Sequence, residues 1–263
     1  MAGKGQVNTP RVAVLVDTST MWGRQVVAGI QHYALRHGPW LTFIEPRGIE
    51  EVLRVPQGWR GHGVIARIGQ PEMARELKAL RRPVVNVSGI LAPGATFPRV
   101  TTDLAASGRM AADYFHQRGY RHFGYFALTG LSYVAAQQEA FAAQVAETGG
   151  SFAVYAVRPH RGAEPDWNLS LEQLGAWLRG LPKPVAILTW NASASRELLY
   201  AAQAVGLPVP EDVAVLSGTD DDLFCEFSPV PLSGIRPPAE QIGHRAAAML
   251  DRLMAGKAAP ARP

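Results

Sequence analysis

Short apolar runs alternate with longer amphipathic stretches along almost the whole chain. Eight of the runs are four to six residues long and rich in Val, Ile and Phe, which is typical of strands buried on both faces. These runs are residues 12–16, 41–44, 63–68, 83–87, 123–127, 152–157, 185–189 and 213–216. The stretches between them predict helices at residues 24–36, 71–80, 104–118, 133–147, 170–179, 193–205 and 239–254. This alternation predicts an α/β fold of βα units with parallel sheets.

Capping residues support the predicted helices. Ser19 or Thr20 can cap the first helix, because a hydroxyl oxygen can accept hydrogen bonds from the free amides of the first turn. Asp103 can cap the helix that follows it in the same way. The boundaries of these two helices are therefore predicted by local chemistry as well as by periodicity.

The length of the chain favours two lobes. The 263 residues suit two cores of about 120 residues each better than one. We expect an N-terminal lobe from residues 11–119 and 236–256, and a C-terminal lobe from residues 120–235. Prolines around residues 229–238 favour an extended crossing there, and the last helix is expected to pack back on the first lobe. Residues 1–10 are expected to be disordered, and residues 257–263 to form a tail.

Composition excludes several classes of protein. Hydrophobic residues make up 47% and charged residues 18%, so the chain can bury a core. The net charge of +4 is too small to indicate a nucleic-acid-binding domain. The single Cys225 excludes an internal disulfide and a cysteine-based zinc site. Because no apolar run approaches the ~20 residues that span a bilayer, and residues 1–10 lack a secretion signal, we expect a cytoplasmic protein without a membrane partner.

Motifs for catalysis, cofactors and metals are missing from the sequence. There is no P-loop, no dinucleotide-binding glycine motif and no nucleophile elbow, and the seven histidines form no ligand cluster. We therefore expect neither an enzyme nor a cofactor nor a metal site. One acidic run, Asp220, Asp221 and Asp222, can be interpreted as a metal site, as a polar turn that caps a helix, or as a group that accepts hydrogen bonds from hydroxyls. We prefer hydroxyl recognition to metal, because no histidine or second acidic cluster is available as a co-ligand.

Polar and aromatic residues follow the carboxyl ends of the predicted strands, where parallel sheets bind their ligands. Flat aromatic faces beside carboxylate, amide and guanidinium groups suit a sugar, although each aromatic side chain alone could equally be part of the core. In the first lobe these candidate ligand-binding residues are Ser19, Trp22, Arg24, Arg67 and Ser88. In the second lobe they are Tyr133, Trp190, Asn191, Asp220 and Asp221.

An ordered set of segments covers residues 11–256 and carries a family resemblance. These segments are residues 17–30, 39–40, 63–67, 100–103, 118–123, 209–216, 231–235 and 241–250. Together they resemble the ligand-sensing domain of XylR-type regulators, the xylose-operon regulators of the AraC family. The resemblance implies a LacI-like, periplasmic-binding-protein-like (type I) domain with two Rossmann-like lobes, three crossovers between them and a sugar in the cleft. It also implies an AraC-type DNA-binding domain, which is absent from this chain.

Three departures from the family pattern bear on the ligand. Gln137 stands where the family commonly has a sugar-binding Arg, and we include it among the ligand-binding residues. Trp190 and Asn191 stand where the family commonly has an Asp, and Thr219 stands at another Asp position, where Asp220 can substitute. Each lost charge-assisted hydrogen bond removes ~1.5–3 kcal/mol. We therefore expect the ligand to be a molecule other than xylose.

The resulting hypothesis is an effector-sensing domain of a transcriptional regulator. A sugar-like effector would favour closure of the lobes, because only closure lets both lobes contact it. A homodimer would pass the change to DNA through the absent domain. The alternative is a stand-alone solute-binding protein of a sugar transporter.

Overall fold

The computed structural model describes residues 9–46, 48, 53–159 and 166–259, and the chain divides into two compact units. Unit 1 consists of Met1–Thr102 and Pro238–Pro263, and unit 2 is Asp103–Pro237. The predicted disorder of residues 1–10 and the predicted tail at 257–263 fall partly outside the described residues. Within the described residues, no helix is both long enough and apolar enough to cross a membrane.

Unit 1 is a parallel sheet with the strand order β2-β1-β3-β4. Its strands are β1 (Arg11–Leu15), β2 (Leu41–Ile44), β3 (Gly63–Ala66) and β4 (Val84–Asn86), and its helices are α1 (Met21–His37), α2 (Pro71–Ala79) and α8 (Ala239–Met254). Apolar side chains of α1 and α8 form one core with the sheet, while those of α2 belong to a second core. The βα units place the strand ends and the helix starts at one edge of the sheet, as the alternating pattern predicts.

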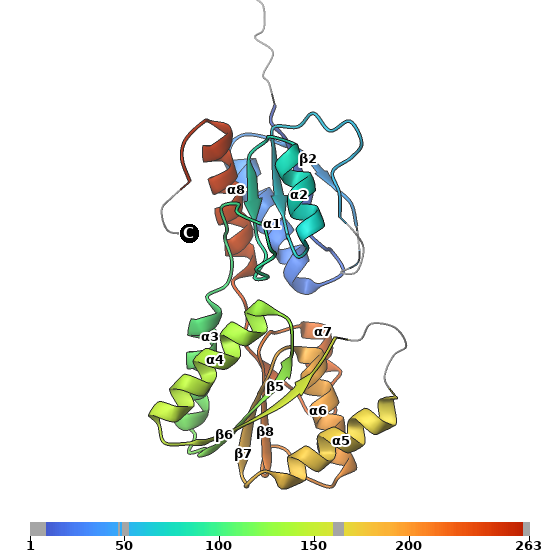
Figure 1. Cartoon of the computed structure of the whole chain (residues 1–263), viewed down its shortest axis with the longest axis vertical. Coiled ribbons are helices and arrows are strands. Elements are labelled where there is room, and N and C mark those ends of the chain that lie inside the picture. Colours follow the sequence, from blue (N-terminus) through green and yellow to red (C-terminus); the bar gives the residue numbers. More distant parts are fainter. Residues whose placement is uncertain (1–8, 47, 49–52, 160–165, 260–263) are drawn as a thin grey trace, which may run out of the picture. The chain divides into compact units, whose positions relative to one another are not determined.

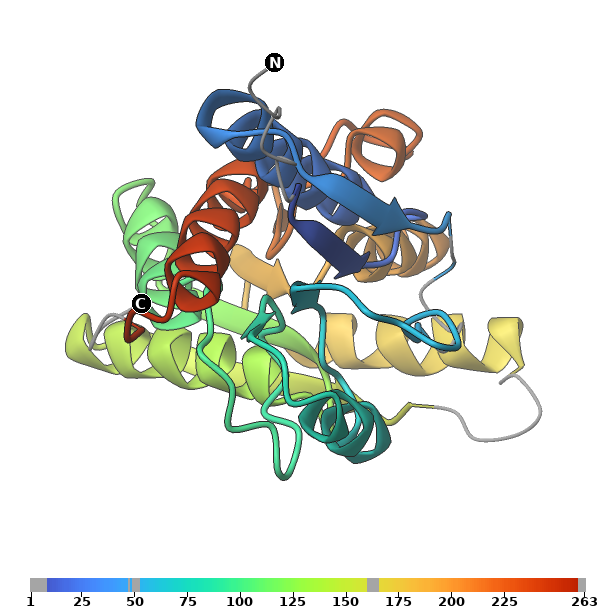
Figure 2. The same ribbon diagram turned by 90° about the horizontal axis from the view of Figure 1, so that it is seen from above.

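Helices α1 and α8 pack with their backbones in close approach. A Cβ atom on Gly29 would lie 1.9 Å from the carbonyl oxygen of Glu240, and one on Gly243 would lie 2.0 Å from that of Val26. The two helices lie side by side in both views (Figure 1 and Figure 2). Only glycine fits at these two positions, so the last helix of the chain is an integral part of unit 1.

Unit 2 is a second parallel sheet, with the order β6-β5-β7-β8-β9. Its strands are β5 (His122–Leu128), β6 (Ser151–Val157), β7 (Val185–Thr189), β8 (Val213–Ser217) and β9 (Ser233–Gly234), and its helices are α3 (Leu104–His116), α4 (Ser132–Glu147), α5 (Trp167–Gly180), α6 (Ala192–Ala204) and α7 (Asp222–Glu226). Helices α3 and α4 cover one face of this sheet, and α5 and α6 cover the other (Figure 1). Strands β5 and β7 are therefore buried on both faces, in keeping with their apolar sequences.

The predicted α/β class with two parallel-sheet lobes is confirmed, and so are all eight strands and seven long helices. Thr20 and Asp103 cap α1 and α3 through their side-chain oxygens. The sequence did not predict α7 and β9, which have five and two residues. Elements this short contain too few residues for a periodic pattern to emerge.

The boundaries between the units differ from the predicted ones. The first lies between Thr102 and Asp103 rather than near residue 119, because α3 packs on α4 of unit 2. A Cβ atom on Gly108 of α3 would lie 2.3 Å from the carbonyl oxygen of Gln137 of α4. The second boundary lies between Pro237 and Pro238. Within the described residues, the chain therefore passes between the units at these two boundaries.

Candidate functional site

The candidate residues of unit 1 gather around a buried carboxylate at the end of β1. One oxygen of Asp17 accepts a hydrogen bond from Arg67 Nη1 at 2.6 Å, and the other accepts one from the Thr20 hydroxyl at 2.7 Å. The guanidinium carbon of Arg67 lies 5.2 Å from the centre of the Trp22 ring. Asp17 is only 2% exposed, so the ion pair holds Arg67 in place beside Trp22. The two candidates Trp22 and Arg67 are thus brought together by Asp17, which is not among the predicted residues.

The other three candidates of unit 1 are Ser19, Arg24 and Ser88. Arg24 bonds to backbone carbonyl oxygens, including that of Ser19, and Ser88 is buried. The exposed Arg24 donates from Nη1 to the carbonyl oxygens of Thr18 and Ser19, at 3.1 and 2.9 Å. Ser88 is fully buried, and its hydroxyl oxygen accepts a hydrogen bond from the amide of Ile90 at 3.0 Å. Of the set predicted in the first lobe, Ser88 is therefore shielded from solvent, whereas Ser19 and Arg24 are exposed.

In unit 2, two candidates act as helix caps. Asn191 Oδ1 accepts a hydrogen bond from the amide of Ala194 at 2.8 Å and begins α6. Asp221 Oδ1 accepts from the amide of Phe224 at 3.5 Å and begins α7. Capping is one of the interpretations that the sequence left open for the acidic run, and the structure shows it for Asp221. Among the described residues, no group of three or more His, Cys, Asp or Glu side chains could hold a metal ion.

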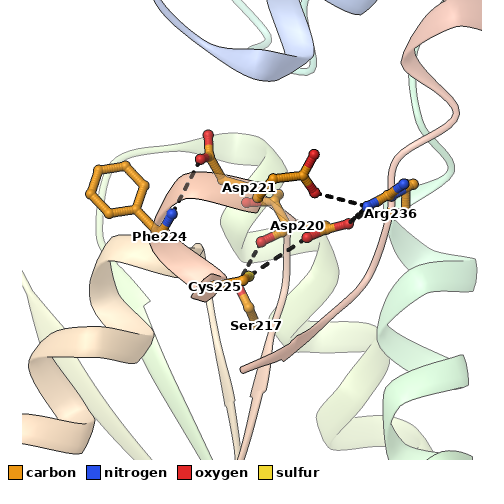
Figure 3. Close-up of polar contacts among 8 residues, drawn as sticks. Ser217, Asp220, Asp221, Phe224, Cys225 and Arg236 are labelled. Carbon is orange, nitrogen blue, oxygen red and sulfur yellow. Dashed lines mark hydrogen bonds and ion pairs between the residues drawn. The ribbon is translucent and has the colours of Figure 1, made fainter. Parts of the chain in front are cut away.

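The carboxylate of Asp220 is held from two sides (Figure 3). Its Oδ2 accepts a hydrogen bond from Arg236 Nε at 2.6 Å, and its Oδ1 accepts a weaker one from Cys225 Sγ at 3.6 Å. Arg236 also donates from Nη2 to Asp222 at 2.9 Å. The hydrogen bond to Asp220, followed by the charges of Asp220 and Asp222, raises the pKa of Arg236. Because Arg236 directly precedes the last residue of unit 2, these bonds tie the acidic loop to the segment that leads out of the unit.

The aromatic candidates of unit 2 are half-buried. Tyr133, in the first turn of α4, packs against the core under α3 and α4. Trp190 directly follows β7 and packs against the cores on both faces of the sheet. Each ring is therefore partly in the core and partly exposed to solvent.

Gln137 is buried instead of exposed at the edge of the sheet. Its side chain is 3% exposed and lies within hydrogen-bonding distance of Tyr125, Ser107 and Gly218. Burial, with a smaller contribution from Tyr133, raises the pKa of the Tyr125 phenol, so this partner stays protonated at neutral pH. The structure thus places Gln137 beneath the loop that carries Asp220, among protein partners.

Sequence reasoning missed Asp17 and Arg236, and each had a partial signal. Asp17 directly follows the first apolar run, where polar residues at strand ends are expected, and Arg236 lies in the proline-rich crossing. Neither signal predicts which residue forms the ion pair, because Asp17 and Arg67 are 50 residues apart and Asp220 and Arg236 are 16 apart.

The thiol of Cys225 reports on the Asp220 carboxylate. Burial raises the pKa of Cys225, the nearby Asp220 charge adds to the rise, and the hydrogen bond with the Asp221 backbone opposes it. Since the thiolate is the reactive form, a raised pKa slows alkylation at pH 8. We expect Asp220→Asn to lower this pKa and to speed alkylation by about threefold. The measurement is the iodoacetamide rate as a function of pH, with Asp222→Asn as the control, and an unchanged rate in Asp220→Asn would contradict the assignment.

Two family models match the chain in sequence. The model of the XylR N-terminal domain matches residues 11–107, and the model of periplasmic binding protein-like domains matches residues 112–263. The second match covers more than half of the chain. The two matched segments follow one another with only residues 108–111 between them.

The curated relatives of this chain are described as xylose operon regulatory proteins. The xylose operon regulatory protein of Escherichia coli (strain K12) is 27% identical over 251 residues, which cover 93% of this chain and 63% of that protein. The protein of that name from Haemophilus influenzae is 24% identical over 254 residues, which cover 94% of this chain and 65% of the relative. The chain therefore spans slightly less than two thirds of the length of these relatives.

Solved structures share the fold. The structure of the xylose-binding transcription activator xylR superposes with a TM-score of 0.82 at 26% identity, over 98% of this chain and 66% of that chain. A periplasmic binding protein/LacI transcriptional regulator from Alkaliphilus metalliredigens, complexed with D-xylulofuranose, has a TM-score of 0.72 at 17% identity, over 97% of this chain and 94% of that one. At 17% identity the second comparison shows the fold alone.

Proposed function

Because this chain belongs to the family of periplasmic binding protein-like domains, we propose that it is the effector-sensing domain of a transcriptional regulator. The observation that carries the proposal is the pair of consecutive matches, first to a XylR N-terminal domain and then to a periplasmic binding protein-like domain. The curated relatives are operon regulators, and the solved relative is described as a xylose-binding activator. The proposed effector is accordingly a sugar or a sugar-like molecule, and the proposed role is binding rather than catalysis.

Asp220 is the residue that we assign to hydroxyl recognition in unit 2. A carboxylate offers about four lone-pair sites, so Asp220 can accept hydrogen bonds from a ligand while Arg236 and Cys225 hold its orientation. We assign the aromatic face to Trp190, which directly follows β7. The amide of Gly218 donates to the carbonyl of Thr189 at 2.7 Å and so joins the ends of β7 and β8. A carboxylate fixed in advance loses little side-chain entropy when a ligand binds.

Arg67 and Trp22 are the corresponding pair in unit 1. Arg67 keeps four further N–H donors beyond the one given to Asp17, and guanidinium donors form strong hydrogen bonds to sugar oxygens. The Trp22 ring beside it offers a flat surface to the CH face of a sugar. We therefore assign one charged group and one aromatic ring to effector binding in each unit. Variants of the Arg67–Trp22 pair and of the Asp220–Trp190 pair can test the two assignments separately.

The proposed effector is a sugar other than xylose. The argument rests on Gln137, Trp190–Asn191 and Thr219, which stand where the family commonly has charged residues. The buried position of Gln137 supports it, since its amide is directed to protein partners and not to the edge of the sheet. We further propose that the parent regulator is a cytoplasmic homodimer that acts on DNA through a separate domain.

Ligand screening tests the proposed function. Thermal unfolding of the chain is measured with neutral pentoses, hexoses and sugar acids at millimolar concentration, and calorimetry follows for each hit. We expect one of these compounds to raise the unfolding temperature, because a ligand that binds only the folded state stabilises it. Xylose itself is expected to show no micromolar affinity.

A pair of aspartate variants controls this screen. Asp220→Asn is expected to weaken binding by roughly 10- to 100-fold, as the loss of a charge-assisted hydrogen bond of ~1.5–3 kcal/mol implies. Asp222→Asn is the matched control, because it also loses a contact with Arg236 but is assigned no role in binding. A screen without any stabilising sugar would count against the function, and equal effects of the two variants would count against the assignment of Asp220.

A further inference from the structure

The interior of unit 2 contains a polar network directly under the Asp220 loop. The Tyr125 hydroxyl donates to Gln137 Oε1 at 2.9 Å, and Gln137 Nε2 donates to Ser107 Oγ at 2.8 Å. Nε2 also reaches the carbonyl oxygen of Gly218 at 3.4 Å. Tyr125, Gln137 and Ser107 are 0%, 3% and 6% exposed. One amide thus connects β5, α3 and α4 to the first residue after β8, in a place where unpaired polar groups are costly.

Gly218 lies between the Gln137 amide and the end of β7, where there is no space for a side chain. A Cβ atom at this position would come within 2.5 Å of the carbonyl oxygen of Thr189 and within 2.7 Å of Gln137 Oε1. The backbone of Gly218 is therefore in direct contact with the Gln137 side chain. A smaller or differently shaped side chain at position 137 would open space on one side of Gly218.

The loop that follows Gly218 leads to Asp220 within two residues. The Ser217 hydroxyl donates to the carbonyl of Thr219 at 2.6 Å, and the amide of Asp220 donates to the carbonyl of Ile235 at 2.8 Å. The first bond closes a turn over residues 217–219, and the second ties Asp220 to the backbone at Ile235. A shift of Gly218 would accordingly displace Asp220 and the beginning of α7. Cys225 lies within this short helix.

The network occupies the hydrogen-bonding groups of the Gln137 amide. Both hydrogens of Nε2 have acceptors, in Ser107 and Gly218, and Oε1 has a donor in Tyr125. Both Nε2 hydrogens are committed to protein acceptors, and the side chain is 3% exposed, so a ligand has little access to this amide. This is the reason to assign Gln137 a role that acts through another residue rather than through direct contact.

We propose that Gln137 is a positioning residue of the effector site, which sets the place of Asp220 through its contact with Gly218. The assignment rests on the proposed function, since it concerns the placement of a residue assigned to that site. The Gln137 side chain is a neutral amide that is buried and bonded to protein groups in the core.

The thiol reactivity of Cys225 tests the proposal without a ligand. The chain has one cysteine, so the rate of reaction with the Ellman reagent at pH 8 measures this thiol alone. We expect Gln137→Met, which keeps the length of the side chain but removes its hydrogen bonds, to raise the rate by about three- to tenfold as the loop loosens. Ser107→Ala, which removes one acceptor of the amide with little loss of packing, is expected to change the rate in the same direction, and it carries the test if Gln137→Met does not fold.

Leu174→Val provides the matched control. Leu174 is fully buried in the core on the opposite face of the sheet, so this variant lowers the unfolding temperature without touching the loop. Its rate is expected to stay within twofold of the wild type. The proposal is overturned if the folded Gln137 and Ser107 variants react no faster than Leu174→Val at an equal loss of unfolding temperature. Because no sugar is present in the assay, a failed ligand screen leaves this result unaffected.

Discussion

A chain that ends at Pro237 is expected to lose the folded state of unit 1 while unit 2 remains folded. Helix α8 contributes Ile242, Met249 and Leu250 to the core on the α1 face of the first sheet. Burying three such side chains contributes ~5–9 kcal/mol, which is comparable to the whole stability of a domain. Unit 2 contains both of its own cores within Asp103–Pro237 and loses no side chain in this truncation.

Hydrogen exchange measured peptide by peptide distinguishes the two units. In the truncated chain, peptides from β1, β3 and α1 are expected to exchange as fast as an unfolded chain, while peptides from β5 and β7 keep their protection. A chain that ends at Ala258 retains all of α8 and serves as the control. Protected peptides from β1 in the shorter chain would show that unit 1 does not depend on α8.

Replacing Arg67 by methionine is expected to destabilise unit 1 by ~3 kcal/mol, because it leaves the Asp17 carboxylate buried without a counter-charge. The side chain of Asp17 is 3% exposed, so its carboxylate depends on this protein partner more than on solvent. Methionine keeps much of the aliphatic length of arginine, and the expected loss therefore reports charge pairing more than packing. Urea unfolding followed by circular dichroism measures the change.

A double variant separates the ion pair from other effects of the substitution. Asp17→Asn combined with Arg67→Met removes both charges, and we expect it to recover most of the stability that Arg67→Met loses. Arg24→Met is the control, since the Arg24 side chain is exposed and donates to two backbone carbonyl oxygens, and its effect should stay below ~1 kcal/mol. Equal losses in Arg24→Met and Arg67→Met would refute the role of the buried pair.

The long elements of the fold were predictable because their information is local. A strand such as residues 185–189 is apolar at every position, and a helix such as residues 239–254 repeats its apolar positions at helical spacing. The packing of the last helix on the first lobe was also predicted, and the structure places α8 in unit 1. The first boundary was not predicted, because α3 has an apolar face that fits either lobe until its contact with α4 is known.

The sequence predicted which candidate residues follow the strand ends, but it did not predict the groups that their side chains contact. The rule that ligands bind beyond the carboxyl ends of parallel strands selected Arg67 and Asp220 from the sequence. It did not show that Ser88 is buried, nor that Asn191 and Asp221 cap helices. These outcomes depend on how far each side chain reaches and on what lies beside it after folding.

The sequence by itself determined the α/β class, the order of the long elements and the edge at which polar residues collect, because hydrophobic periodicity and capping act over a few residues. The tertiary structure alone decided what those polar residues do. Gln137 bonds to groups 12, 30 and 81 residues away in the chain, and Asp17 pairs with a residue 50 positions away. A buried polar group must find a partner wherever the packed chain provides one, and that partner is defined by folding and not by spacing in the sequence.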